Sequence, residues 1–198
     1  MVTQGGVTRF WWVRHGPTHA KCMVGWTDLA ADLSDLAAIA RLSAHLPGDG
    51  VVVSSDLSRA VATADALCGR RERLPHDPAL REIHFGDWEM RGFAEIEAET
   101  PDHIRAFWET PGDVRPPGGE SWNALAARVT TATDRLLANH RGRDIIVTAH
   151  FGAILAALQR AEGLAPEAVF AHRIDNLSVT CLSHDDTGWR THAVNHLP

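Results

Sequence analysis

The sequence is short of several features that mark particular classes of protein. It has no tyrosine, which excludes phenol chemistry, and its three cysteines lie far apart at Cys22, Cys68 and Cys181 with no CxxC pair. An odd number of thiols at this spacing favours reduced cysteines over a disulfide framework. No apolar run approaches the ~20 residues needed to cross a bilayer. Residues 1–8 lack the basic and apolar parts of a secretory signal. We therefore expect a cytoplasmic protein with no membrane partner.

Positively charged residues are fewer than negatively charged ones. Lys and Arg number 19 against 25 Asp and Glu, which gives a net charge of -6 at pH 7. This balance argues against nucleic acid as a partner, but it leaves room for a small anion, since a few converging arginines make a pocket locally positive. The chain has 198 residues, 44% of them hydrophobic, which fits one domain with a substantial core. A homodimer is the default expectation for its assembly.

Apolar segments rich in β-branched and aromatic residues alternate with longer segments of helical periodicity. This alternation predicts an α/β layered fold. Strands are expected at residues 8–14, 50–53 and 144–148, and an antiparallel hairpin at 177–182 and 190–194. Helices are expected at 33–46, from N-caps at 54–56 to about residue 70, at 121–139 and at 152–161.

One segment breaks the alternation. Residues 84–119 are rich in acidic residues, tryptophan, proline and glycine, and they end in Pro116-Pro117-Gly118-Gly119. We interpret this segment as a helical and loop insertion that caps one end of the sheet. Both of its flanks continue the same alternating pattern, so the Pro/Gly stretch is a loop and residues 1–198 form a single domain.

Chemically useful side chains follow three of the expected strands. Arg14 and His15 end the first strand, Arg59 lies just beyond the second, and His150 follows the strand at 144–148. If these strands are parallel neighbours, their carboxyl ends bring the four side chains to one place. The helices that begin there add backbone N–H donors and partial positive charge. A phosphate group is the ligand that explains this concentration of cations and donors.

The residue types then suggest a mechanism for phosphoryl transfer. Arg14 and Arg59 have the planar fork that grips phosphoryl oxygens, and stabilising those oxygens is most of the catalytic task. His15 can attack phosphorus only through an unprotonated ring nitrogen. Positive neighbours favour that state by lowering its pKa, and a backbone carbonyl on the other nitrogen would fix the tautomer. Glu82 is the candidate acid for the leaving group, with acidic alternatives at Asp87, Glu89, Glu95 and Glu97.

These residues fall in motifs that resemble a known family. Arg14-His15-Gly16-Pro17-Thr18 resembles the RHGxT signature of the histidine phosphatase superfamily, in its phosphoglycerate mutase-like branch. Four later segments follow in the family's order, namely SSDLSRAVATA at 54–64, LREIHFGDWEM at 80–90, GGES at 118–121 and TAHFGAI at 148–154. A single RHG recurs by chance, whereas five motifs in the right order are specific.

The resemblance implies a fold and a set of roles. It implies a three-layer α/β/α sandwich with a mostly parallel mixed sheet, no metal and no cofactor. It implies a phosphohistidine at His15, phosphate contacts from Arg14, Arg59 and His150, and proton donation by Glu82.

The sequence departs from the family's pattern around this core. Pro17 stands where many relatives have an acidic residue, Lys21 where they often have asparagine, Phe151 in place of a glycine and Asp56 in place of a proline. These departures bear on the substrate more than on the reaction, and Lys21 would add a charge for a second acidic group.

Other residues have two interpretations each. Thr18 and Ser121 are either phosphate ligands at the substrate rim or turn and cap residues. Trp88 and Trp108 are candidates to line the substrate pocket, whereas Trp11, Trp12 and Trp122 are expected in the core.

The leading prediction is a phosphatase of the histidine acid phosphatase type, which hydrolyses the monoester of a small phosphorylated metabolite. The first alternative is a mutase, although mutases of this family are longer, with an insertion not found here. A metal-dependent hydrolase would use His15, His19, Glu82 and His150, but Pro17 opposes the helix that the spacing of the first two needs. A catalytically silent phosphate-binding module would have lost a catalytic residue, and none is missing.

Overall fold

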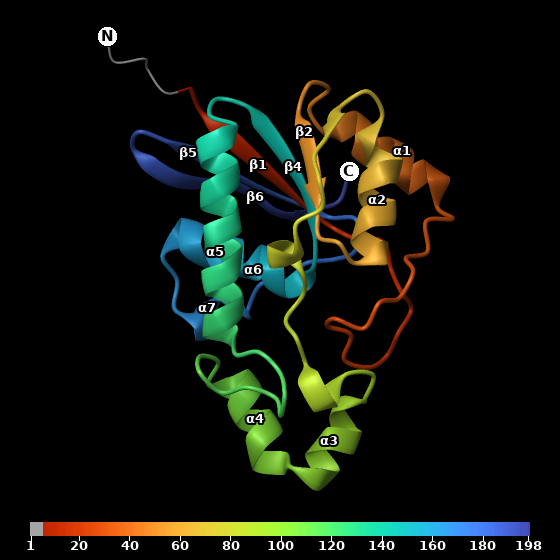
Figure 1. Cartoon of the computed structure of the whole chain (residues 1–198), viewed down its shortest axis with the longest axis vertical. Helices are drawn as coiled ribbons and strands as arrows, with labels where there is room; N and C mark the ends of the chain where they lie inside the picture. The colour runs from red at the N-terminus through yellow and green to blue at the C-terminus, as the bar shows by residue number, and fades with distance from the viewer. Residues whose placement is uncertain (1–5) are drawn as a thin grey trace.

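The computed structural model describes residues 6–198, so most of the segment searched for a secretory signal lies outside the described part of the chain. Within it the chain forms a six-stranded sheet with the order β3-β2-β4-β1-β5-β6 (Figure 1). Strands β1 to β4 are parallel to one another. At one edge of the sheet, β5 runs antiparallel to β1, and β6 runs antiparallel to β5. The strands are β1 (Thr8–Arg14), β2 (Val51–Ser54), β3 (Glu72–Arg73), β4 (Asp144–Ala149), β5 (Val179–Asp185) and β6 (Gly188–His196).

Helices connect the parallel strands and form the end of the molecule beyond them. The α-helices are α1 (Leu36–His45), α2 (Ser58–Cys68), α3 (Phe93–Glu99), α4 (Pro101–Glu109), α5 (Trp122–Asn139), α6 (Phe151–Glu162) and α7 (Pro166–Val169). Two short 3-10 helices, η1 (Pro78–Leu80) and η2 (Gly86–Trp88), lie before α3. Among residues 6–198, none of these helices combines the length and the apolar composition that a membrane crossing requires.

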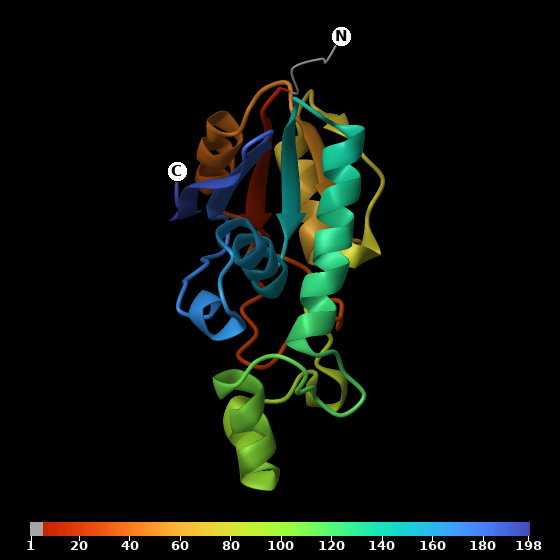
Figure 2. The same ribbon diagram turned by 90° about the vertical axis from the view of Figure 1, so that its left-hand side faces the viewer.

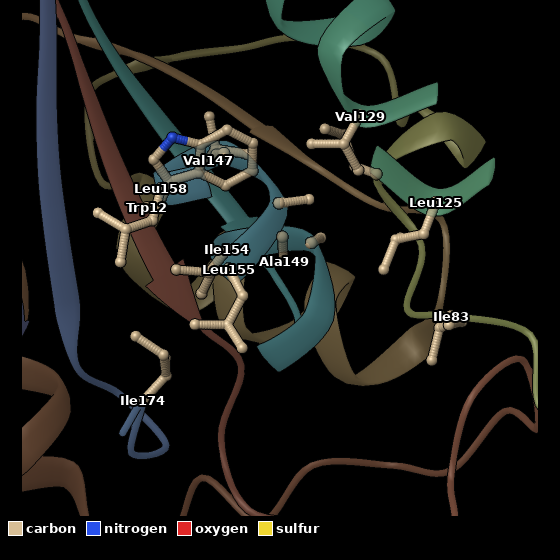
Figure 3. Close-up of a cluster of buried hydrophobic side chains, with 14 of the residues drawn as sticks. Trp12, Ile83, Leu125, Val129, Val147, Ala149, Ile154, Leu155, Leu158 and Ile174 are labelled. Carbon is tan, nitrogen blue, oxygen red and sulfur yellow. The ribbon is translucent and has the colours of Figure 1, made fainter. Parts of the chain in front are cut away.

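The alternation of side chains along each strand creates two apolar faces. Phe10 and Trp12 of β1 join one cluster, which α5 and α6 cover (Figure 3). Val13 and the partly buried Trp11 join a second cluster on the opposite face, which α1 and α2 cover. The predicted three-layer α/β/α arrangement with a mostly parallel sheet is confirmed. Trp12 and Trp122 lie in the core as expected, while Trp11 is only partly buried.

Two helices begin later than predicted. The first was expected from residue 33 but begins at Leu36, behind the N-cap Asp35, and Leu36 is 75% exposed. None of residues 54–56 caps α2. Instead the backbone N–H of Ser58 donates to Asp28 Oδ1 at 2.7 Å. A carboxylate 30 residues away in sequence thus substitutes for a local cap, which sequence patterns cannot reveal.

The acidic segment 84–119 folds into η2, α3, α4 and the loop that leads into α5. It lies beyond the carboxyl ends of β1 and β4, whose arrows point toward it (Figures 1 and 2). Trp88, Ile104 and Phe107 are buried and belong to the same cluster as the sheet. At Gly86, which has φ +53°, a Cβ atom would lie 2.1 Å from the carbonyl oxygen of Pro117, so the loop can close only on glycine.

Candidate active site

The order of the sheet brings the predicted residues together. Strand β4 lies between β2 and β1, and Arg14 is in register with Ala149. The backbone N–H of His15 continues this ladder by donating to the Ala149 carbonyl at 3.0 Å. The imidazole rings of His15 and His150 consequently lie with their centroids 5.0 Å apart. Adjacent parallel strands are the reason why residues so distant in the sequence meet.

His15 is held as a neutral imidazole with one free nitrogen. Its Nδ1 lies 2.6 Å from the carbonyl oxygen of Gly16, which can only accept a hydrogen bond, so Nδ1 carries the proton. Burial and the nearby Arg59 guanidinium lower the pKa of His15 to about 3. Nε2 therefore keeps its lone pair over the whole range above pH 3, which is the state that a nucleophile needs.

Arg14 and Arg59 are two cations without a carboxylate partner. Arg59 is 1% exposed, and its two terminal nitrogens donate to the carbonyls of Thr27 at 2.9 Å and Gly25 at 2.5 Å. Arg14 Nη1 donates to the Ile174 carbonyl at 2.7 Å, and its buried Nε has no partner within residues 6–198. Over the same residues, neither guanidinium forms a salt bridge. Buried charge of this kind is stabilised by an anionic ligand.

Glu82 is buried beside these cations and is held by backbone amides. Its Oε1 accepts hydrogen bonds from the N–H of Ile83 at 2.8 Å and of Gly152 at 3.0 Å. Burial raises the pKa of the Glu82 carboxyl, against the lowering effect of these amides and of the two arginines. Its backbone carbonyl accepts from Trp26 Nε1 and Arg128 Nη2, each at 2.8 Å. The site thus contains a carboxyl group in a fixed place that favours the protonated form.

His150 lies behind His15 and is fully buried. Its Nε2 is 2.6 Å from Ser55 Oγ, and its Nδ1 has no partner in the part of the chain that the structure describes. Burial, together with the neighbouring His15 and arginines, lowers the pKa of His150 well below its ordinary value. His150 is therefore neutral. From the sequence, Ser55 was expected only as an N-cap within the segment SSDLSRAVATA, and its contact with His150 was not predicted.

A cavity of about 270 Å³ lies at this place, and His150, buried next to His15, is not among the residues that line it. His15, Arg14, Arg59 and Glu82 form its polar side. The rest of its lining consists of Thr18, Ala20, Cys22, Met23, Val24, Phe85, Trp108 and Phe151. The Phe151 ring centre lies 5.7 Å from the Arg14 guanidinium carbon, which places an aromatic face beside this cation.

Three expected rim residues lie elsewhere. Lys21 is exposed and does not line the cavity, because the loop that follows Thr18 turns its side chain to the surface. Ser121 is 2% exposed and caps α5 by accepting from the N–H of Ala124 at 3.2 Å, so of its two interpretations the cap is correct. Trp88 packs edge-on against Phe107 inside the insertion instead of lining the cavity.

Glu89 is a further site residue whose role the sequence did not reveal. Its carboxylate accepts from the backbone N–H groups of residues 25–27 and Phe85 and from the Thr27 hydroxyl, at 2.7–3.1 Å. Burial acts to raise the pKa of Glu89, but the hydrogen bonds from these donors together outweigh burial, and the pKa is lowered. The carboxylate is therefore ionised and unsuited to act as an acid. Residues 25 and 27 are the ones whose carbonyls hold Arg59. Glu89 therefore holds residues 25–27 in place, and the carbonyls of this loop in turn position Arg59.

Of the four side chains named for a metal-dependent hydrolase, His19 lies apart from the other three. His19 is exposed, with φ +58°, and its Nε2 pairs with Asp32 Oδ2 at 2.8 Å away from His15. Over residues 6–198, no three or more His, Cys, Asp or Glu side chains are grouped closely enough to hold a metal ion.

The model of the histidine phosphatase superfamily (branch 1) matches residues 10–197. The chain belongs to this superfamily. The resemblance carried by the sequence motifs is thereby confirmed, and it extends over nearly the whole chain.

Named relatives are 30–40% identical to the chain over the aligned residues. The chain is 30% identical to the adenosylcobalamin/alpha-ribazole phosphatase of Escherichia coli over 84% of its own length and 85% of that protein. It is 40% identical to phosphoglycerate mutase-like protein 4 of Arabidopsis thaliana over 65% of its length, but covers only 56% of that protein. The solved structure of a mycobacterial glucosyl-3-phosphoglycerate phosphatase superposes with a TM-score of 0.80 at 30% identity, covering 96% of this chain and 99% of the other.

Proposed function

We propose that this protein is a phosphomonoesterase that hydrolyses a small phosphorylated metabolite through a phosphohistidine at His15. The observation that carries the proposal is a neutral histidine nucleophile between two unpaired guanidinium groups, with a buried carboxyl group in the same cavity. Both relatives named as phosphatases support the phosphatase class that the sequence predicted.

In the first step, Nε2 of His15 attacks phosphorus and the bond to the leaving oxygen breaks. Arg14 and Arg59 stabilise the charge on the phosphoryl oxygens, since both are already desolvated and in place. The buried N–H of His150, on the nitrogen away from Ser55, supplies a further donor when the Ser55 hydroxyl donates to Nε2. Glu82 gives its proton to the leaving oxygen, which departs as an alcohol.

In the second step, Glu82 acts as a base. Its carboxylate takes a proton from a water molecule, whose oxygen attacks phosphorus while the bond between phosphorus and Nε2 of His15 breaks. Inorganic phosphate leaves, His15 returns to its neutral state and Glu82 is protonated again. Burial raises the pKa of Glu82, which favours the protonated acid that the first step needs and makes its carboxylate a stronger base in the second step.

The experiment that tests the nucleophile is mass spectrometry of acid-labile phosphate after a rapid quench with p-nitrophenyl phosphate. Phosphate on the peptide that contains His15, absent together with turnover in His15→Ala, is the expected result. His19→Ala is the matched control, because this exposed histidine lies four residues further on and pairs with Asp32 outside the cavity. Normal turnover by His15→Ala, or phosphate on another residue, would overturn the mechanism.

Release of phosphate separates hydrolysis from mutase activity. A mutase returns the phosphoryl group to an acceptor hydroxyl, whereas the proposed enzyme delivers it to water. Free phosphate should therefore equal the alcohol released, and retention of labelled phosphate in the organic product would favour the mutase. A homodimer remains our expectation for assembly, which light scattering of the purified chain checks directly.

A further inference from the structure

The cavity has a polar side and an apolar side, and the two sides meet different parts of a substrate. His15 and the two arginines hold the phosphoryl group, so the leaving group extends toward the remaining wall. That wall is formed by Phe85, Trp108 and Phe151, with Met23 beside them. Aromatic rings of this kind pack favourably against another ring, edge-on or in offset stacks. The wall therefore favours an apolar leaving group with a flat surface.

The apolar side also continues deeper. A second, narrow cavity of about 30 Å³ shares Glu82, Phe85, Trp108 and Phe151 with the first. Its further lining adds three aromatic side chains, namely Phe107 of α4, Trp122 of α5 and Phe170, together with Ile83 and Gly152. Trp108 packs against Phe107 and Phe170 at centroid distances of 4.9 and 5.9 Å, so the wall is a continuous aromatic cluster.

Charge supplies an independent observation. Apart from Arg14 and Arg59, no arginine or lysine lines the main cavity within residues 6–198, and Lys21 lies outside it. A second anionic group on the substrate would have to share the two guanidinium groups with the phosphate or remain unpaired against aromatic rings. An unpaired charge in such a place is strongly disfavoured.

We propose that the substrate's leaving alcohol carries an aromatic ring and no anionic group, and that Trp108, Phe151 and Phe85 are the residues that select it. This inference rests on the proposed phosphatase activity and narrows its substrate class. It sets this chain apart from an enzyme that selects phosphoglycerates, whose leaving group bears a carboxylate.

The test compares three alkyl phosphates whose leaving alcohols differ little in acidity. Rates of phosphate release are measured for 2-phenylethyl phosphate, sn-glycerol 3-phosphate and 3-phosphoglycerate, with p-nitrophenyl phosphate as the reference for basal activity. The phenylethyl ester should exceed the other two by about 10- to 100-fold in kcat/KM, the effect of burying one aromatic ring. Equal rates, or preference for 3-phosphoglycerate, would overturn the inference and leave the phosphatase intact. No release from any of the four esters would overturn the proposed function and the inference with it.

Variants of Trp108 locate the selection. Trp108→Ala should reduce the ratio of kcat/KM between the phenylethyl and glycerol esters, and Trp108→Phe should restore most of it. Phe93→Ala is the control, because Phe93 lies in the same insertion, is 46% exposed and lines neither cavity. Circular dichroism checks folding, and Trp108→Leu keeps an apolar side chain if the alanine variant unfolds. An unchanged ratio in a folded Trp108→Ala or Trp108→Leu variant contradicts the assignment of selection to this ring.

Discussion

Glu82→Gln is the substitution that most directly tests the acid. Glutamine has the same shape, and its carbonyl oxygen can take the place of Glu82 Oε1, which accepts from Ile83 at 2.8 Å and Gly152 at 3.0 Å. Glu82 as a whole residue is only 8% exposed, so water cannot readily replace its carboxyl as a proton donor. The variant should therefore fold normally and lack only the proton.

The size of the effect depends on the leaving group. Acid assistance contributes about 100- to 10,000-fold, or roughly 3–5 kcal/mol of transition-state stabilisation. For an alkyl ester such as 2-phenylethyl phosphate, which leaves as a strongly basic alkoxide, kcat/KM should fall by that factor. For p-nitrophenyl phosphate, whose leaving group is stable as an anion, the first step should fall by less than about tenfold. Burst kinetics separate this step from hydrolysis of the phosphohistidine, which should slow with either ester.

A matched control excludes a general effect of removing a carboxylate near the site. Glu95→Gln removes an exposed carboxylate of α3 that pairs with Arg91 at 2.8 Å, and it should leave both rates unchanged. If Glu82→Gln slows formation of the phosphohistidine by the same factor with both esters, Glu82 is not the proton donor and the reasoning is refuted.

Three further outcomes are expected. His15, with a pKa lowered to about 3, gains its lone pair at acidic pH, and Glu82, with a raised pKa, keeps its proton above the usual carboxyl range. With an alkyl ester, kcat/KM should therefore rise near pH 3 and fall as Glu82 ionises. The Glu82→Gln variant should lack that fall, although both enzymes should show the change that ionisation of the phosphate ester itself causes. Glu89→Gln replaces the carboxylate that holds residues 25–27 with a weaker acceptor. It should lower kcat/KM by the same factor for alkyl and aryl esters, and it should lower the free energy of unfolding in urea by about 1.5–3 kcal/mol. A loss of kcat/KM that depends on the leaving group would contradict this positioning role. Ser55→Ala leaves His150 without its 2.6 Å partner and should cost about 1–3 kcal/mol of stability together with activity. Thr131→Ala removes an exposed hydroxyl that donates to the Ala127 carbonyl within α5, and it should leave activity unchanged.

Sequence patterns predicted the parts of the site that depend on strand order. Arg14, His15, Arg59 and His150 follow strands or begin helices, and a parallel sheet places such positions at one edge whatever the details of packing. The neutral state of His15 could also be expected, because burial beside cations disfavours protonation in any arrangement. The strands and main helices were recognisable for the same reason, since periodicity is a local signal.

What the sequence did not reveal depends on contacts between distant segments. Glu89 was only one of several nearby acids, and nothing in its neighbours indicates that its carboxylate would bind residues 25–27. Lys21 was expected to add charge to the cavity, but its orientation is set by how the loop after Thr18 packs. Two-residue strand β3 carries too little pattern to be recognised at all.

The contact between Glu82 and Gly152 affects how the site can change. A Cβ atom at position 152 would lie 2.3 Å from Glu82 Oε1, so the proton donor rests directly on main chain at the start of α6. Its location is therefore tied to the path of the backbone from β4 into α6, which substitution of surrounding side chains leaves in place. Broad variation along the aromatic wall could then alter which alcohol departs while the acid stays where it is. A single added methyl group, Gly152→Ala, would displace the carboxyl although no ionisable residue is replaced.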